Sequence, residues 1–276
     1  MMDKLTEIIN HKKREVENRK GLYPVRLLEQ SIFFPTKSLS LKHYIKRPDK
    51  SGVIAEIKRK SPSKGDINPY VSVERTSIGY MQAGASALSV LTDKEFFGGS
   101  NDDLVVARRF NFCPILRKEF IIDEYQVIES KSIGADAILL IAAVLDENEL
   151  LKLTQFAHSL GLEVLIEIHE EAELDRCLSA NADLVGVNNR DLRTFKVDLN
   201  QSIRLAKKLP DDAVKIAESG IDSAATAAYL SQNGFDGFLI GESFMRAARP
   251  EIAAGEFIKE LNRLKAKTKS DVTVKA

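Results

Sequence analysis

Residues 53–67 read VIAEIKRKSPSKGDI, an apolar run that ends in charged residues and continues into a loop rich in Lys, Ser and Gly. If residues 53–58 form a β-strand, successive side chains point to opposite faces, so Glu56 and Lys58 share one face. A buried carboxylate or ammonium group is unfavourable unless it is paired, hydrogen-bonded or open to a ligand. The end of this strand therefore predicts a functional site, and the alternative is a structural ion pair between the two side chains.

Short apolar runs of this kind recur along the chain and alternate with segments that have the pattern of amphipathic helices. The eight runs are residues 53–58, 87–92, 114–118, 137–142, 163–168, 184–188, 213–218 and 237–241. Alternating strands and helices are typical of a parallel sheet, and eight such units close most naturally into a (β/α)8 TIM barrel. The competing topology, a doubly wound open sheet, is disfavoured because no GxGxxG turn follows the first run.

The chain is long enough for one large domain, and we assign residues 1–276 to a single (β/α)8 barrel domain. Residues 1–50 precede the first strand and form an N-terminal helical extension, with a polar helix over about residues 2–20. Pro250 is suited to the first turn of a last helix. We expect residues 266–276 to form a flexible tail.

The overall charge is balanced, because 40 Lys and Arg residues oppose 40 Asp and Glu residues. A neutral chain with a pI near 6.9 lacks the basic footprint of nucleic-acid-binding proteins. The charged N-terminus has no signal-peptide pattern and no apolar run is long enough to cross a membrane, so we expect a cytoplasmic protein without a membrane partner. Protein partners cannot be inferred from these features.

Cysteine and histidine are sparse, and their spacing does not indicate a metal site. Cys113 and Cys177 lack CxxC spacing, so neither a disulfide framework nor a zinc site is expected. The four histidines show no HExxH or comparable ligand pattern. One of them, His169, is expected to hydrogen-bond at a strand end or to face solvent rather than to act in catalysis.

Polar residues close several of the predicted strands, and the active sites of (β/α)8 barrels lie at the carboxyl ends of their strands. Each residue alone could be a structural ion-pair partner, but their coincidence at one barrel mouth favours a catalytic interpretation. Lysines and glutamates inside such a mouth provide general acids and bases, because burial and neighbouring charges shift their pKa values toward neutrality. The residues at these ends are Glu56, Lys58, Lys118, Glu167, Asn188, Arg190, Glu218 and Ser219.

A phosphate site is indicated by the glycine-containing loops after the seventh and eighth strands, where barrels often bind phosphate. Lys60 and Ser61 could add a charge and a hydroxyl from the loop after the first strand. Loops 61–66 and 95–100 are candidates to close over a ligand. Phe96 and Phe97 in the second loop could form a wall for an aromatic ring or pack against the N-terminal extension. The two glycine-containing segments are Glu218-Ser219-Gly220 and Gly241-Glu242-Ser243.

These segments together resemble the indole-3-glycerol phosphate synthase family over about residues 1–262. The motifs that carry the resemblance are EIKRKSPSKGDI, VLTDKEFFGGS, PILRKEFIID, VLIEIH, VGVNNRDLRTF, AESGI and LIGESFMR. The resemblance implies a (β/α)8 barrel with an N-terminal helical extension and a carboxy-lyase that needs no cofactor or metal. Its substrate would be 1-(2-carboxyphenylamino)-1-deoxyribulose 5-phosphate, and its products indole-3-glycerol phosphate, carbon dioxide and water, in tryptophan biosynthesis.

The resemblance also implies roles for individual residues. The catalytic polar set would be Glu56, Lys58, Lys118, Glu167, Asn188, Glu218 and Ser219. The phosphate would be surrounded by Lys60, Ser61, Gly220, Gly241 and Glu242. The rest of the substrate pocket would be formed by Phe97 and Phe120 near the aromatic ring and by Leu139, Ile141, Arg190 and Leu192.

Two residues depart from the pattern of many family members. Glu119 replaces an Asp after the catalytic lysine, and we expect it to face away from the mouth because it is the next residue on the strand. Glu242 replaces a Ser, which removes a hydroxyl and places a carboxylate beside the phosphate.

The chemistry implied by this family requires acids for ring closure and dehydration and a base for dehydration. We assign ring closure to Lys118, and dehydration to Lys58 as acid and Glu167 as base, with Glu56 orienting Lys58. The resemblance does not settle how the two lysines divide the work. Two other functions stay open: a Schiff-base aldolase that uses a buried lysine, and a non-catalytic protein that binds a phosphorylated metabolite.

Overall fold

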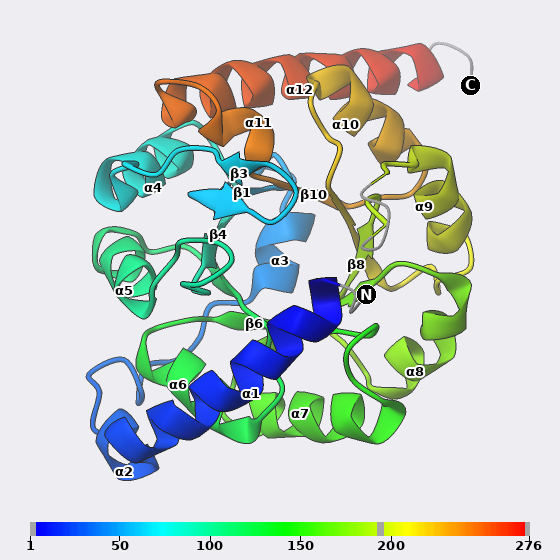
Figure 1. The fold of residues 1–276 in the computed structure, drawn as a ribbon. Helices are drawn as coiled ribbons and strands as arrows, with labels where there is room; N and C mark the ends of the chain where they lie inside the picture. Colours follow the sequence, from blue (N-terminus) through cyan, green and yellow to red (C-terminus); the bar gives the residue numbers. More distant parts are fainter. Residues whose placement is uncertain (1–3, 192–195, 274–276) are drawn as a thin grey trace.

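The computed structural model describes residues 4–191 and 196–273, with side chains described through residue 267. Eight parallel strands close into a barrel in the order β1-β10-β9-β8-β7-β6-β5-β4. Figure 1 shows the helices arranged around these strands. The barrel strands are β1 (Val53–Ile57), β4 (Ala87–Leu91), β5 (Ile115–Lys118), β6 (Ala137–Ile141), β7 (Glu163–Ile168), β8 (Leu184–Asn188), β9 (Val214–Glu218) and β10 (Gly237–Ile240).

The structure confirms the predicted (β/α)8 barrel and its eight strands, whose observed bounds differ from the predicted ones by one residue or none. A short hairpin of β2 (Lys60–Ser61) and β3 (Gly65–Asp66) lies in the loop after β1. The outer helices are α4 (Val73–Gln82), α5 (Asn101–Phe110), α6 (Glu124–Ser132), α7 (Glu147–Ser159), η1 (Glu171–Glu173), α8 (Leu174–Ser179), α9 (Leu199–Ala206), α10 (Ala224–Gln232), α11 (Glu242–Met245) and α12 (Pro250–Thr273).

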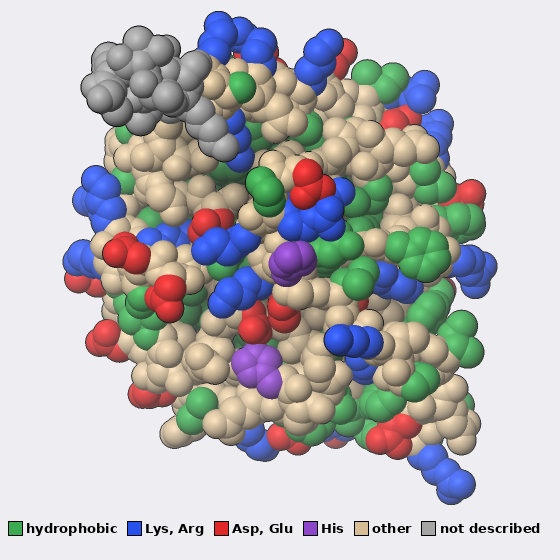
Figure 2. All heavy atoms as spheres, turned by 180° about the vertical axis from the view of Figure 1, so that it is seen from behind, with side chains coloured by type: hydrophobic (Ala, Val, Ile, Leu, Met, Phe, Trp, Pro, Cys, Tyr) green, Lys and Arg blue, Asp and Glu red, His purple; other side chains and the backbone are tan. Residues whose placement is uncertain are grey.

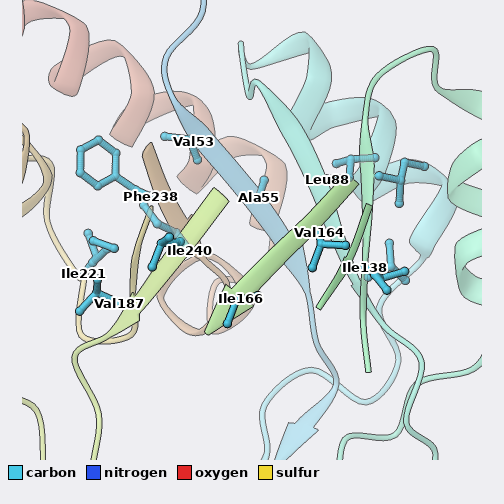
Figure 3. Close-up of a cluster of buried hydrophobic side chains, with 14 of the residues drawn as sticks. Val53, Ala55, Leu88, Ile138, Val164, Ile166, Val187, Ile221, Phe238 and Ile240 are labelled. Carbon is cyan, nitrogen blue, oxygen red and sulfur yellow. The ribbon is translucent and has the colours of Figure 1, made fainter. Parts of the chain in front are cut away.

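The alternation of side chains along the strands produces two separate apolar layers. On β1, Val53, Ala55 and Ile57 belong to the outer layer between strands and helices, part of which is drawn in Figure 3. Ile54 belongs to the inner layer, which fills the barrel. Glu56 is buried and follows Ile54 at a spacing of two residues, so it points into the barrel as the sequence predicted.

The N-terminal extension contributes three helices, α1 (Lys4–Leu22), α2 (Val25–Leu28) and α3 (Leu41–Lys46). Leu41 and Ile45 of α3 pack into the inner apolar layer and close one end of the barrel. Helix α1 crosses the front of the barrel in Figure 1 and buries Ile8, Lys12 and Val16 at a helical spacing of four residues. The extension therefore covers both openings of the barrel.

Helix α12 begins at Pro250 as predicted and continues to Thr273, so residues 266–273 are helical. Flexibility of residues 266–276 stays a prediction. Figure 2 shows the face opposite to that in Figure 1, where basic and acidic side chains are interspersed. Cys113 and Cys177 are both buried and unpaired by a disulfide. None of the helices in the described ranges combines the length and apolar character needed to span a membrane.

Candidate active site

A cavity of about 510 Å³ lies at the carboxyl ends of the strands, beneath the start of α1. It brings together most of the residues singled out in the sequence, which lie on six of the strands or in the segments that follow barrel strands. Their binding and catalytic roles stay predictions. The predicted site residues in its lining are Glu56, Lys58, Ser61, Phe97, Lys118, Phe120, Leu139, Ile141, Glu167, Asn188, Arg190, Glu218, Ser219, Gly220, Gly241 and Glu242.

Two predicted residues are not part of this lining. Lys60 lies in β2, where its backbone N–H donates a hydrogen bond of 3.2 Å to the carbonyl of Phe97. Leu192 lies outside the described residues.

Lys118 occupies the centre of the site, between two carboxylates from other strands. Its Nζ lies 2.9 Å from Oε2 of Glu167 and 2.5 Å from Oε2 of Glu218. The Nδ2 of Asn188 donates a 3.1 Å hydrogen bond to Oε1 of Glu167. Strands β5, β7, β8 and β9 thus hold one ammonium group and two carboxyl groups in direct contact.

The pKa values of these three groups diverge. Burial alone would lower the pKa of Lys118, but Glu167 and Glu218 outweigh burial and raise it. Burial raises the pKa of Glu167, but Lys118 and His169 more than reverse that effect and hold it well below its usual range. Burial raises the pKa of Glu218 to about 8 despite Lys118. Near neutral pH the site therefore holds an ammonium group, a carboxylate and a protonated carboxylic acid, a combination suited to acid–base catalysis.

A second acid–base pair comes from β1 and the residue after it. The Nζ of Lys58 lies 2.8 Å from Oε1 of Glu56. Hydroxyl Oγ of Ser89 donates a 3.4 Å hydrogen bond to the other oxygen of Glu56. The structural ion pair considered as an alternative is therefore present, and both of its members line the cavity.

Two glycines make room for the carboxyl groups inside the barrel. A Cβ atom on Gly241 would lie 2.5 Å from Oε1 of Glu56, and one on Gly186 would lie 2.2 Å from Oε1 of Glu218. Both distances are shorter than van der Waals contact, so a side chain at either position would displace the neighbouring glutamate. Sequence reasoning identified Gly241 but not Gly186, whose only signal is a glycine inside a strand.

The loop after β9 has an unusual backbone where it borders the cavity. Ser219 and Gly220 have φ angles of 65° and 66°, in the left-handed region. A serine in this region is uncommon and strained, and such residues cluster at ligand-binding and active sites. This loop and Gly241 lie in the same lining, as expected for a phosphate site.

The carboxylate of Glu242 is not isolated beside this loop. Arg190 Nη2 lies 3.4 Å from its Oε2, and Nη2 of Arg246 forms an ion pair with its Oε1. Arg246 also lines the cavity. Sequence reasoning missed Arg246, although its position four residues after Glu242 on a short helix was a signal for this pair.

The two phenylalanines of the loop after β4 have different surroundings. Phe97 lines the cavity, and its ring centroid lies 5.9 Å from that of Phe120. The ring of Phe96 instead contacts α1, where His11 lies at a centroid distance of 5.5 Å and the Lys4 ammonium lies 5.0 Å from the ring. Packing against the N-terminal extension therefore applies to Phe96, and the role of Phe97 as a wall for an aromatic ring stays a prediction.

Lys12 of α1 is buried against three carboxylates, and sequence reasoning did not identify it. Its side chain is 1% exposed, and its Nζ lies 2.9 Å from Asp93, 3.0 Å from Glu119 and 2.8 Å from Glu15. Asp93 Oδ1 accepts hydrogen bonds from the backbone N–H groups of Phe96 and Phe97 at 2.7 and 3.2 Å. Lys12 thus ties α1 to the loop that carries Phe97.

Glu119 is placed differently from the expectation that it would face away from the mouth. It lines the cavity, and its Oε1 accepts a 2.8 Å hydrogen bond from the backbone N–H of Phe120 as well as contacting Lys12. The strict alternation of a strand does not apply, because β5 ends at Lys118. Glu119 therefore connects α1 with the loop after β5.

No group of three or more His, Cys, Asp or Glu side chains within residues 4–191 and 196–273 is arranged to hold a metal ion. A closed parallel barrel whose lysines and glutamates meet at the carboxyl ends of the strands has the architecture of a (β/α)8-barrel enzyme. Comparison with known proteins identifies the family. The family model described as Indole-3-glycerol phosphate synthase matches residues 5–260, and the chain belongs to this family.

Curated relatives support the same assignment. The indole-3-glycerol phosphate synthase of Bacteroides thetaiotaomicron is 46% identical over 261 residues, which cover 95% of this chain and 100% of that protein. The indole-3-glycerol phosphate synthase of Caldanaerobacter subterraneus subsp. tengcongensis is 43% identical, with coverage of 93% and 98%. The resemblance drawn from the sequence motifs is therefore confirmed.

Solved structures of other proteins share the barrel fold with this chain, and their low sequence identity shows nothing beyond the fold. Thiamine phosphate pyrophosphorylase from Pyrococcus furiosus superposes with a TM-score of 0.59 at 14% identity, covering 82% of this chain and 99% of that chain. For 3-hexulose-6-phosphate synthase from Salmonella typhimurium the TM-score is 0.58 at 14% identity, covering 77% and 99%.

Proposed function

We propose that the cavity converts 1-(2-carboxyphenylamino)-1-deoxyribulose 5-phosphate into indole-3-glycerol phosphate, carbon dioxide and water, as a carboxy-lyase of tryptophan biosynthesis. Membership in the indole-3-glycerol phosphate synthase family supports this reaction. The observation that carries the residue assignments is the position of Lys118 between Glu167 and Glu218 inside the cavity. A cytoplasmic location stays a prediction.

Binding of the substrate uses two chemically different parts of the lining. Phe97 and Phe120 face the aromatic ring of the substrate, with Leu139 and Ile141 on the barrel floor. The loop after β9, together with Gly241 and Ser61, surrounds the phosphate, and Arg190 and Arg246 supply positive charge beside Glu242. Lys60 lies in the adjacent hairpin and could reach the same anion.

Ring closure joins the aromatic carbon that bears the carboxylate to the carbonyl carbon of the ribulose chain. Lys118 donates its proton to the carbonyl oxygen as the new carbon–carbon bond forms. Glu218 lies 2.5 Å from Lys118 and, with a pKa of about 8, holds the proton that restores the ammonium group once dehydration is complete. The bond to the carboxylate then breaks, and its electron pair restores the aromatic ring as carbon dioxide leaves.

Dehydration needs an acid for the departing hydroxyl and a base for the neighbouring carbon. Lys58 protonates the hydroxyl, and Glu56 at 2.8 Å holds the lysine in position. Glu167 accepts the proton from the carbon beside nitrogen, which completes the indole. Its pKa lies well below the usual range, so Glu167 is present as the carboxylate this step requires.

The direct test is to mix the purified protein with the carboxyphenylamino-ribulose phosphate and to follow indole fluorescence and carbon dioxide release, with EDTA present in a parallel reaction. We expect equal amounts of both products in both reactions. A protein that binds the substrate without releasing carbon dioxide would be a metabolite-binding protein. A borohydride-trapped adduct with a ketose phosphate would indicate a Schiff-base aldolase, which requires a neutral lysine and is disfavoured by the raised pKa of Lys118.

The carboxyl group of Glu218 predicts a specific pH dependence. Because its protonated form resupplies Lys118, turnover of the wild type should fall as pH rises through about 8, the pKa of Glu218. Glu218→Gln should lower turnover by about tenfold or more and remove this decline. The measurement is turnover at saturating substrate between pH 6 and 9.5.

Asp222 offers a control, because it is exposed and lines the same cavity. The variant Asp222→Asn should keep the decline near pH 8. If Glu218→Gln also kept it, another group would be responsible and the proton-resupply role of Glu218 would be wrong.

A further inference from the structure

His169 contacts the proposed base of the reaction, although the steps described above do not use it. It follows Ile168, the last residue of β7, and lies two residues after Glu167 in the sequence. The imidazole is 11% exposed, and its Nε2 lies 3.2 Å from Oε1 of Glu167. His169 thus contacts the base but is not part of the cavity lining.

A second carboxylate fixes the position of this histidine. Glu173 in η1 accepts a 2.6 Å hydrogen bond from the backbone N–H of His169, and its Oε2 lies 3.9 Å from Nδ1 of the ring. Gln201 of α9 donates a 3.2 Å hydrogen bond to the His169 carbonyl. Glu173 is itself paired with Arg176 of α8 at 3.6 Å. The ring therefore stands between two carboxylates, with its backbone held on both sides.

The contact between His169 and Glu167 depends on the charge of the ring. Within the described part of the chain, neither ring nitrogen makes a well-aligned hydrogen bond. A neutral imidazole therefore contributes little to holding Glu167, whereas an imidazolium forms an ion pair with it. Burial lowers the pKa of His169, but the carboxylates of Glu167 and Glu173 outweigh burial and raise it above its ordinary value. The imidazolium therefore persists to a higher pH than that of an ordinary histidine.

The two oxygens of Glu167 have different partners. Oε2 faces Lys118 at 2.9 Å, while Oε1 faces both Asn188 at 3.1 Å and His169 at 3.2 Å. When Lys118 gives its proton to the substrate it becomes neutral, and its ion pair with Oε2 is lost. The partners on Oε1 are unaffected by that step and continue to hold the carboxylate.

We propose that His169 is a positioning residue whose imidazolium holds Oε1 of Glu167 in place while Lys118 is deprotonated, so that Oε2 is free to accept the proton of the dehydration step. This role rests on the proposed function, because it concerns the base of that reaction. It also makes the protonation of His169 a determinant of turnover. The groups around the ring are Glu167 on β7, Glu173 on η1, Glu218 on β9, Lys118 on β5 beyond Glu167, and Arg176 on α8 beyond Glu173.

The test compares wild type with His169→Asn, whose side chain cannot become a cation. At pH 6 we expect the kcat of the variant to be about tenfold lower than that of the wild type. A tenfold change in rate corresponds to the free energy of a one-unit pKa shift. The KM of the variant should stay within about twofold of the wild-type value. The ratio of the wild-type kcat to the variant kcat should decrease toward one as pH rises through the raised pKa of His169. The effect of Glu218 cancels in this ratio, because both proteins contain it.

His158 provides a matched control, since its Nε2 also pairs with a carboxylate, Asp183, at 2.8 Å. His158 lies outside the cavity lining, so His158→Asn should give a ratio near one at every pH. A ratio for His169→Asn that is constant with pH, or a kcat within twofold of wild type at pH 6, would overturn the proposal.

A second measurement does not depend on activity. The imidazole of His169 is titrated by NMR in wild type and in Glu167→Gln, without substrate. Coupling between the two residues predicts a lower pKa for His169 in Glu167→Gln, and an unchanged titration would overturn the proposal. If the wild type failed to release carbon dioxide, the proposed function would be wrong even where this coupling was found.

Discussion

Lys118→Ala should lower turnover by more than about a hundredfold, the usual scale for loss of a general acid, while thermal stability changes little. The structure explains why stability should be retained. Removing the ammonium group leaves Glu167 and Glu218 facing one another, but Glu218 has a pKa of about 8 and is protonated near neutrality. Two bare carboxylates are therefore not forced together, and the Glu167 carboxylate keeps its contacts with Asn188 and His169.

The measurement combines turnover by indole fluorescence with the melting temperature of each variant. Lys118→Arg is the matched control, because it keeps a positive charge between the same carboxylates but does not release a proton in the accessible pH range. We expect it to be nearly as inactive as Lys118→Ala. Recovery of turnover in Lys118→Arg would mean that charge alone is needed, and near-normal turnover in Lys118→Ala would remove Lys118 from the acid role altogether.

The barrel could be predicted from the sequence because the information that defines it is local. Each strand is a short run of apolar, β-branched residues, and the alternation of side chains in residues 53–58 was enough to place Glu56 inside the barrel. The same rule brought Lys118, Glu167 and Glu218 to one mouth, since the carboxyl ends of all strands in a closed parallel barrel meet there.

Residues whose role depends on contacts distant in sequence could not be found in this way. Lys12 lies in the polar segment HKKRE and has the pattern of a solvated helix residue. Its burial follows only once α1 is known to cross the barrel mouth. The charge of His169 likewise depends on Glu173, whose position is set by the turn into η1. Glu119 was misplaced because the alternation rule was extended one residue beyond the end of the strand.

Lys12→Met should be the most destabilising single substitution proposed for this chain. Removing one member of a buried ion pair lowers the free energy of unfolding by about 3–5 kcal/mol, because the remaining charge stays buried without a partner. Here Asp93 and Glu119 are the residues left behind, at 0% and 3% exposure. Equilibrium unfolding in urea measures the loss. Lys13→Met, an exposed neighbour on the same helix, should change the free energy of unfolding by less than about 0.5 kcal/mol.

The cause of that loss can be separated from a simple packing defect. Adding Asp93→Asn and Glu119→Gln to Lys12→Met removes the unpaired charges while keeping side chains of similar size. If the buried charges are responsible, this triple variant should recover part of the lost free energy of unfolding. Equal unfolding free energies for Lys12→Met and Lys13→Met would show that α1 is held on the barrel by its apolar contacts alone.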